Sequence, residues 1–102
     1  MKNKTGIKLE EIERILKKNK PLLEEKFKVK EVGIFGSYLR GEQKKASDLD
    51  LLVAFLEPVG LFHFIQLEEF LSGELGIKVD LVMKDALKAR IRDRVIKEAI
   101  YV

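Results

Sequence analysis

Three short apolar runs constrain the fold of this chain more than any other feature of its sequence. They cover residues 30–35, 49–55 and 77–83. Runs of this length and composition are typical of buried β-strands. Helical patterns lie before, between and after them, at residues 8–27, 61–74 and 86–99. The order α-β-β-α-β-α therefore predicts an α+β fold, in which helices cover a small mixed β-sheet.

Length and composition limit what the chain can be. With 102 residues there is room for one hydrophobic core, so we expect a single domain over residues 1–102. The absence of cysteine excludes disulfides and thiolate metal sites. No apolar run approaches the roughly 18 residues of a transmembrane helix, and the first residues lack the apolar segment of a signal peptide. We therefore expect a cytoplasmic protein without a membrane partner.

Two of the apolar runs carry acidic residues at positions where a buried strand is normally apolar. Asp48 and Asp50 stand at the beginning of the second run and, being two residues apart, should project from the same face of a strand. Asp80 interrupts the third run, where a buried carboxylate is costly unless it is paired or coordinated. Taken singly, these acids also fit a helix cap, a loop or an exposed sheet edge. Together they form the oxygen-rich ligand set that Mg²⁺ prefers.

A glycine-containing turn follows the first apolar run. Gly36 allows a positive φ angle or close approach of a ligand to the backbone, and Ser37 is suited to cap a short helical turn. Backbone N–H groups at such a turn attract phosphate. The Ser37 hydroxyl and, one turn later, the Arg40 guanidinium are further candidate phosphate ligands. A Gly-Ser pair alone is usually only a turn. With Asp48 after ten intervening residues, it predicts a phosphate site beside a metal site.

Gly36-Ser37, ten intervening residues and Asp48-Leu49-Asp50 together resemble the signature of the DNA polymerase beta-type nucleotidyltransferases. Longer strings resemble the minimal nucleotidyltransferase (MNT) branch of that superfamily, and the resemblance covers nearly the whole chain. It implies nucleotide binding by Gly36 and Ser37, and catalysis and metal binding by Asp48, Asp50 and Asp80. Many relatives have Arg-Ala where this chain has Tyr38-Leu39. We expect that difference to alter the wall of the cleft and to leave the metal site intact.

The resemblance also implies an activity and a partner. Many members are antitoxins of HEPN-domain toxins, and characterised examples transfer AMP from ATP to a tyrosine of the toxin. We therefore expect a Mg²⁺-dependent protein adenylyltransferase with two ions. Asp48 and Asp50 would hold the ion that accompanies the triphosphate, and Asp80 would join them in holding a second ion near the acceptor hydroxyl. Two alternatives stay open: an antitoxin that acts by binding and occlusion, and nucleotidyl transfer to RNA or a small molecule.

Two further regions suggest contacts with other molecules. The helix at 61–74 has more apolar residues than one buried face requires, so some of them could form a surface for a partner or for self-association. Residues 84–102 carry six Lys or Arg against three Asp or Glu, which equals the formal net charge of +3 for the whole chain. A solvated helix face explains this excess. The alternatives are binding to nucleic acid, to an acidic partner or to the triphosphate.

Overall fold

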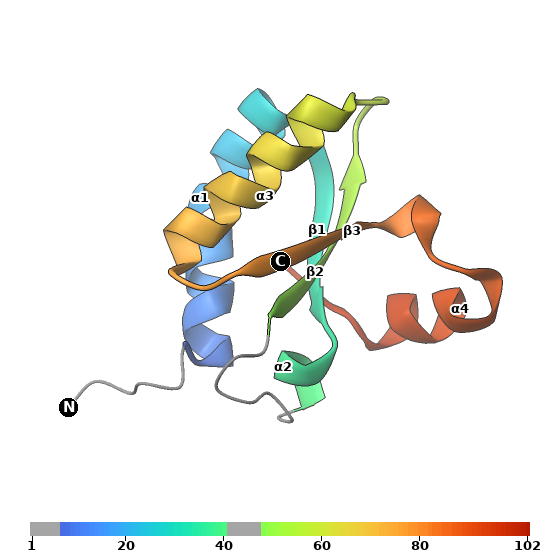
Figure 1. Cartoon of the computed structure of the whole chain (residues 1–102). Coiled ribbons are helices and arrows are strands. Elements are labelled where there is room, and N and C mark those ends of the chain that lie inside the picture. Colours follow the sequence, from blue (N-terminus) through green and yellow to red (C-terminus); the bar gives the residue numbers. More distant parts are fainter. Residues whose placement is uncertain (1–6, 41–47) are drawn as a thin grey trace.

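The computed structural model describes residues 7–40 and 48–102, and it contains the predicted helices and strands together with additional elements near the C-terminus (Figure 1). In chain order the elements are α1 (Leu9–Phe27), β1 (Val29–Phe35), α2 (Ser37–Arg40), β2 (Leu49–Phe55), α3 (Leu61–Leu75), β3 (Val79–Met83), the 3₁₀ helix η1 (Lys84–Ala86), α4 (Ala89–Glu98) and β4 (Ile100–Tyr101). Among the described helices, none is both long enough and apolar enough to cross a bilayer. The loop predicted at 41–47 lies outside the described residues.

The strands form one mixed sheet in the order β3-β2-β1-β4. β1 pairs antiparallel with both β2 and β4, whereas β2 and β3 are parallel. Parallel neighbours need a crossover connection, and α3 supplies it between β2 and β3. The predicted α+β fold class is therefore confirmed, and β3 is an edge strand.

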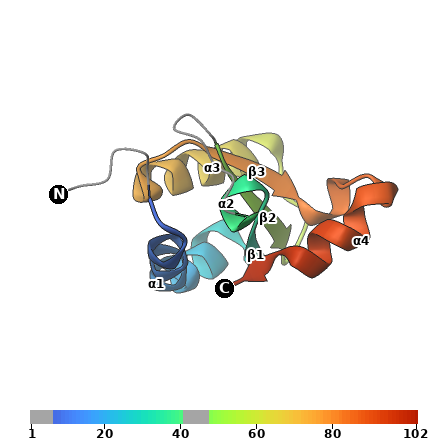
Figure 2. The same cartoon turned by 90° about the horizontal axis from the view of Figure 1, so that it is seen from below.

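One face of the sheet is covered by α1 and α3, which lie on the same side of it in both views (Figures 1 and 2). Every second residue of three strands points to this face and is buried: Val32, Ile34, Leu49, Leu51, Val53, Val79 and Leu81. The helices meet them with residues at helical spacing: Ile12, Leu16, Leu23 and Phe27 from α1, and Leu67, Leu71 and Leu75 from α3. α1 continues through Pro21, which is exposed. The core thus forms where the apolar residues of the strands, which recur every two residues, meet those of the helices, which recur about every 3.6 residues.

We call the opposite face of the sheet the open face. It carries the strand residues that alternate with the core residues, including Asp50 and Leu52 of β2 and Asp80 and Val82 of β3. α4 lies on this side, away from α1 and α3 (Figures 1 and 2). None of the residues of α4, all of which the structure describes, is buried. Part of the open face therefore remains accessible.

The C-terminal region differs from the sequence prediction in two ways. The helix expected at 86–99 is divided, because η1 ends at Ala86 and α4 begins at Ala89. β4 was not predicted, and it pairs with Gly33 and Ile34 of β1. A strand of two residues is too short to show the alternation of apolar and polar residues that indicates a β-strand. It can be recognised only from its pairing with β1.

The apolar residues of α3 fall into a buried group and an exposed group, and the two are more distinct than the sequence suggested. Phe70 packs against the core, as expected. Leu61 and Phe62 do not, since they are 73% and 82% exposed in the first turn of the helix. Ile65 is 37% exposed on the same helix. These exposed members stand apart from the Leu67–Leu71–Leu75 stripe that faces the sheet.

Candidate active site

Asp50 and Asp80 are direct neighbours on adjacent parallel strands. The register pairs the two residues, which places their Cα atoms about 4.8 Å apart. The residues that flank them along the strands are all buried in the core: Leu49, Leu51, Val79 and Leu81. Asp50 and Asp80 therefore point to the open face. Asp50 is half-buried, and Asp80 is exposed on the edge strand. Of the alternatives considered for Asp80, the exposed sheet edge is the one observed, and the strand register sets Asp80 beside Asp50.

Asp48 lies just before β2 and is half-buried. The next residue, Leu49, donates its N–H to the carbonyl oxygen of Lys78 at 2.9 Å, which joins the two chain segments immediately before their strands. Burial raises the pKa of Tyr38, and the negative charge of Asp48 raises it further. The backbone thus brings Asp48 to the end of the sheet at which β2 and β3 begin, where Asp50 and Asp80 also lie.

Gly36 forms the turn that approaches Asp50. Its φ angle is +82°, a conformation that other residues rarely adopt, and its carbonyl oxygen accepts a hydrogen bond from the Leu39 N–H at 3.1 Å. A Cβ atom on Gly36 would lie only 2.9 Å from Cγ and 3.0 Å from Cβ of Asp50. The turn and the carboxylate can meet this closely only because residue 36 has no side chain.

The other predicted phosphate ligands flank α2. This helix begins at Ser37 and ends at Arg40, so Gly36, rather than Ser37, occupies the capping position. The side chains of Ser37 and Arg40 lie outside what the structure describes, and their phosphate contacts stay predictions.

Tyr38 has a role that the sequence reasoning missed. It was expected in the wall of the cleft, but it is only 5% exposed and belongs to the hydrophobic core. The ring therefore fixes the short helix α2 to the body of the protein, and any effect of the Tyr38-Leu39 difference on the cleft wall stays a prediction. An aromatic residue in a four-residue helix next to a functional turn is the signal that could have indicated this, because so small an element needs a large apolar anchor.

A second polar cluster on the open face also escaped the sequence analysis. Lys84 Nζ lies 2.8 Å from Glu31 Oε1 and 5.4 Å from the centre of the Tyr101 ring. The hydrogen bond between the two charged side chains lowers the pKa of Glu31 and raises that of Lys84. The Tyr101 ring packs over Gly33, where a Cβ atom would come within 2.9 Å of it. This cluster joins η1 and β4 to β1. The residues of β1 that take part are Glu31 and Gly33, which lie on the open face of the strand.

A comparison with protein families decides the identity of the fold. The model of the nucleotidyltransferase domain matches residues 9–102. The chain belongs to this family. Protein adenylyltransferase MntA of Thermococcus cleftensis is 54% identical to it over 94 residues, which cover 92% of this chain and 95% of that relative.

Solved structures agree with this assignment and refine it. A structure assigned as a minimal nucleotidyltransferase has 38% sequence identity and a TM-score of 0.79, over 92% of this chain and 95% of that one. A crystal structure of a toxin–antitoxin with AMP-PNP has 25% identity and a TM-score of 0.65, over 90% of this chain and 69% of that one. The resemblance to the minimal nucleotidyltransferases is therefore confirmed.

The acidic residues of this nucleotidyltransferase fit a divalent cation that shares its ligands with a nucleotide. Asp50 and Asp80 offer carboxylates from adjacent strands, and the missing side chain of Gly36 lets the backbone turn lie directly against the Asp50 carboxylate. Within residues 7–40 and 48–102, no three His, Cys, Asp or Glu side chains lie close enough together to hold a metal ion by themselves. Phosphate oxygens and water would have to complete the coordination, which is the usual manner of binding for Mg²⁺.

Proposed function

We propose that this nucleotidyltransferase is a Mg²⁺-dependent protein adenylyltransferase that transfers AMP from ATP to a tyrosine hydroxyl of a HEPN-type toxin. The observation that carries the proposal is the register that sets Asp50 beside Asp80, with the Gly36 turn against Asp50. Two similarities support it. The relative with 54% identity is named as a protein adenylyltransferase, and the relative with 25% identity is a toxin–antitoxin that was crystallised with AMP-PNP.

The residues divide the reaction between a phosphate side and an acceptor side. The Gly36 turn holds the β- and γ-phosphates through backbone N–H groups, and Asp48 and Asp50 face the α-phosphate. Asp80, which is the most exposed of the three acids, takes the proton from the attacking hydroxyl oxygen. That oxygen forms a bond to the α-phosphorus while the bond to the β-phosphate oxygen breaks, and pyrophosphate leaves. Mg²⁺ bound by the carboxylates would neutralise phosphate charge and make the hydroxyl more acidic.

The acceptor has to approach from the open face, because α1 and α3 cover the other face of the sheet. α4 lies on the open side of the sheet (Figure 2). Its residues Arg90, Arg92 and Arg94 are all exposed. The contact of Arg92 with Asp85 is 3.7 Å long and well exposed, so it is weak and easily exchanged. We therefore place an acidic surface of the toxin against α4. Charge reversal at the three arginines should slow association and change its salt dependence, and it should leave Mg-ATP binding intact.

Co-expression with the product of the neighbouring gene tests the proposal. The purified complex is treated with ATP and Mg²⁺, and the intact masses of both chains are measured for the wild type and for Asp50→Asn. Addition of whole AMP units to the partner, absent in Asp50→Asn, is the expected result. A stable complex without any gain in mass would instead favour neutralisation by occlusion. With [α-³²P]ATP, label on RNA or a small molecule and none on the partner would contradict the proposed acceptor.

A further inference from the structure

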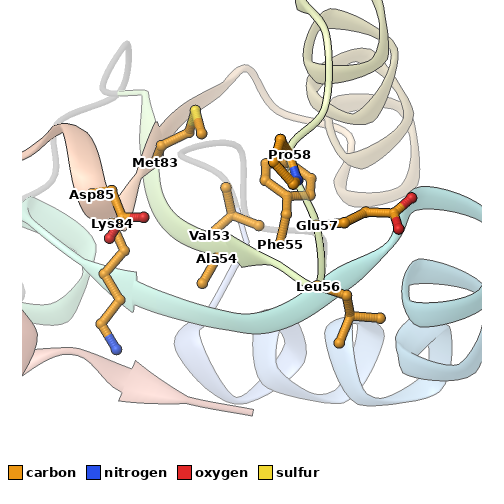
Figure 3. Close-up of a pocket in the computed structure, with 9 residues that line it drawn as sticks. All are labelled: Val53, Ala54, Phe55, Leu56, Glu57, Pro58, Met83, Lys84 and Asp85. Carbon is orange, nitrogen blue, oxygen red and sulfur yellow. The ribbon is translucent and has the colours of Figure 1, made fainter.

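Asp80 stands on a strand that pairs on one side only. Among the strands that the structure describes, β3 is at the edge of the sheet, and its pairing with β2 extends from Val79 to Met83. Where this pairing ends, a cavity of about 340 Å³ is lined by residues 53–58 and 83–85. Figure 3 shows residues 83–85 on one side of the cavity and residues 55–58 on the other. The position of Asp80 therefore depends on what supports the outer side of β3.

Two side chains of α3 hold this outer side. The backbone N–H of Val79 donates to Ser72 Oγ at 3.0 Å, and the N–H of Leu81 donates to Glu68 Oε2 at 2.9 Å. The carbonyl oxygen of Lys78 accepts a hydrogen bond from the first residue of β2. In a trans peptide the following N–H points the opposite way, which is away from β2. Ser72 and Glu68 therefore occupy positions at which a further strand would otherwise pair.

Both contacts form because one turn of the helix matches one repeat of the strand. Glu68 and Ser72 are four residues apart, which is about 6 Å along a helix. Val79 and Leu81 are two residues apart, which is about 7 Å along a strand. The later residue of the helix meets the earlier residue of the strand, so α3 and β3 run antiparallel. This is the direction that the crossover between the parallel strands β2 and β3 requires.

The hydrogen bond of Glu68 acts directly on the backbone of Asp80. The Leu81 N–H belongs to the peptide group that joins Asp80 to Leu81, and Ser72 holds a peptide group one residue before Asp80. Glu68 and Ser72 are half-buried, whereas Asp80 is exposed, so the direction of the Asp80 carboxylate depends on the backbone that carries it.

We infer that Glu68 and Ser72 are positioning residues for AMP transfer, which keep the Asp80 carboxylate beside Asp50. The inference rests on the proposed transferase function. It assigns the two α3 side chains to the acceptor side of the reaction, because Asp80 is the residue that takes the proton from the attacking hydroxyl. Binding of Mg-ATP depends on Asp48, Asp50 and the Gly36 turn, and these lie on other elements of the fold.

Transfer kinetics and ATP binding of Glu68 variants test the inference, with the co-expressed partner as the acceptor. Glu68→Ala should lower kcat at least about 10-fold, since a displacement of about 1 Å at a catalytic group can cost about 100-fold. Its affinity for Mg-ATP, measured by calorimetry, should equal that of the wild type. Glu68→Gln should restore kcat, because its amide oxygen accepts the same N–H. Glu69→Ala is the matched control on the exposed side of the same helix, and it should keep the wild-type kcat.

Ser72→Ala separates positioning from stability. Alanine is a better helix former than serine, which offsets part of the lost hydrogen bond, so the variant should remain folded while kcat falls. Amide hydrogen exchange provides a readout that does not depend on activity. Exchange should become faster at Val79 in Ser72→Ala and at Leu81 in Glu68→Ala. It should stay slow in both variants at Leu52, which is buried in the middle of β2.

Three results would overturn the inference. A wild-type kcat in Glu68→Ala, with faster exchange at Leu81, would show that Glu68 only closes the edge of the sheet. A loss of Mg-ATP binding together with transfer would show a general disturbance of the site. A Glu68→Gln variant as slow as Glu68→Ala would show that the charge of Glu68, and not its hydrogen bond, affects the reaction. A wild type that transfers no AMP to the partner is a different result, because it refutes the proposed function and the inference falls with it.

Discussion

Replacing Gly36 with alanine should cost more activity than stability. The φ angle of +82° disfavours any residue with a side chain, and this strain is worth about 1–2 kcal/mol. The new Cβ atom would also meet Asp50 Cγ at 2.9 Å and Asp50 Cβ at 3.0 Å, so the carboxylate has to move. Crowding of this kind adds about 1–3 kcal/mol. The variant should therefore remain folded in dilute buffer, with a displaced Asp50.

A displacement of about 1 Å at a catalytic group can lower a rate about 100-fold. We expect a loss of that order in AMP transfer by Gly36→Ala, together with weaker ATP binding. Gly36→Val should be more severe, because a β-branched side chain would reach further into the phosphate site. The measurements are transfer rate and ATP affinity, made beside denaturant unfolding of the same preparations.

Gly76→Ala provides the matched control. Gly76 has a similar φ angle of +72°, but no described atom lies within 4 Å of the position that its Cβ would take. It should show the backbone strain of about 1–2 kcal/mol and keep the wild-type transfer rate. Wild-type transfer and ATP affinity in Gly36→Ala would refute the contact between the turn and Asp50 as a feature of the active site. Equal losses of activity in both variants would show that instability alone explains them.

Three further outcomes are expected. Asp50→Asn should abolish transfer and leave the free energy of unfolding equal or higher, because it removes the repulsion with Asp80; denaturant unfolding and a transfer assay check this, and an active variant would contradict the assignment. Asp80→Ala should lose transfer but keep Mg-ATP binding by calorimetry, since its task lies on the acceptor side; full turnover would exclude that task. Lys84 lowers the pKa of Glu31 below the ordinary value of 4.5, so the carboxylate stabilises the fold above pH 4.5 and this contribution is lost as the pH falls through the lower folded-state pKa. Glu31→Gln should reduce that acid-side loss of the free energy of unfolding, by less than about 1 kcal/mol because the pair is partly exposed. Glu25→Gln, on the exposed side of α1, should not reduce it; denaturant unfolding over a range of pH measures both.

The strands and most helices could be predicted because their apolar periods are strong. The run at 49–55 coincides with β2, and the runs at 30–35 and 77–83 differ from β1 and β3 by one and two residues at their beginnings. Elements that depend on distant partners were missed. β4 exists because two residues after α4 pair with Gly33 and Ile34, and no local pattern encodes that pairing.

The active site could be predicted in its chemistry but only partly in its geometry. The spacing of Asp48 and Asp50 indicated a shared face, and Asp80 was expected on a neighbouring strand. The closeness of Gly36 to Asp50 depends on the antiparallel register that pairs Phe35 with Asp50, which the sequence does not reveal. The burial of the Tyr38 ring was not foreseen for a similar reason, because it depends on how α2 packs against the sheet.

The open face of the sheet has to serve two opposed requirements. Its first row, Asp50 beside Asp80, must stay accessible to substrates, whereas Leu52, two residues further along β2 on the same face, is only 1% exposed. α1 and α3 cover the other face of the sheet, and α4, the helix described on the open side, buries none of its own residues. The Tyr101 ring lies over Gly33, the direct neighbour of Leu52, and Lys84 bridges from Glu31 to that ring. The short strand β4 and its cluster therefore shelter the apolar half of the face, and they do so without extending over the carboxylates.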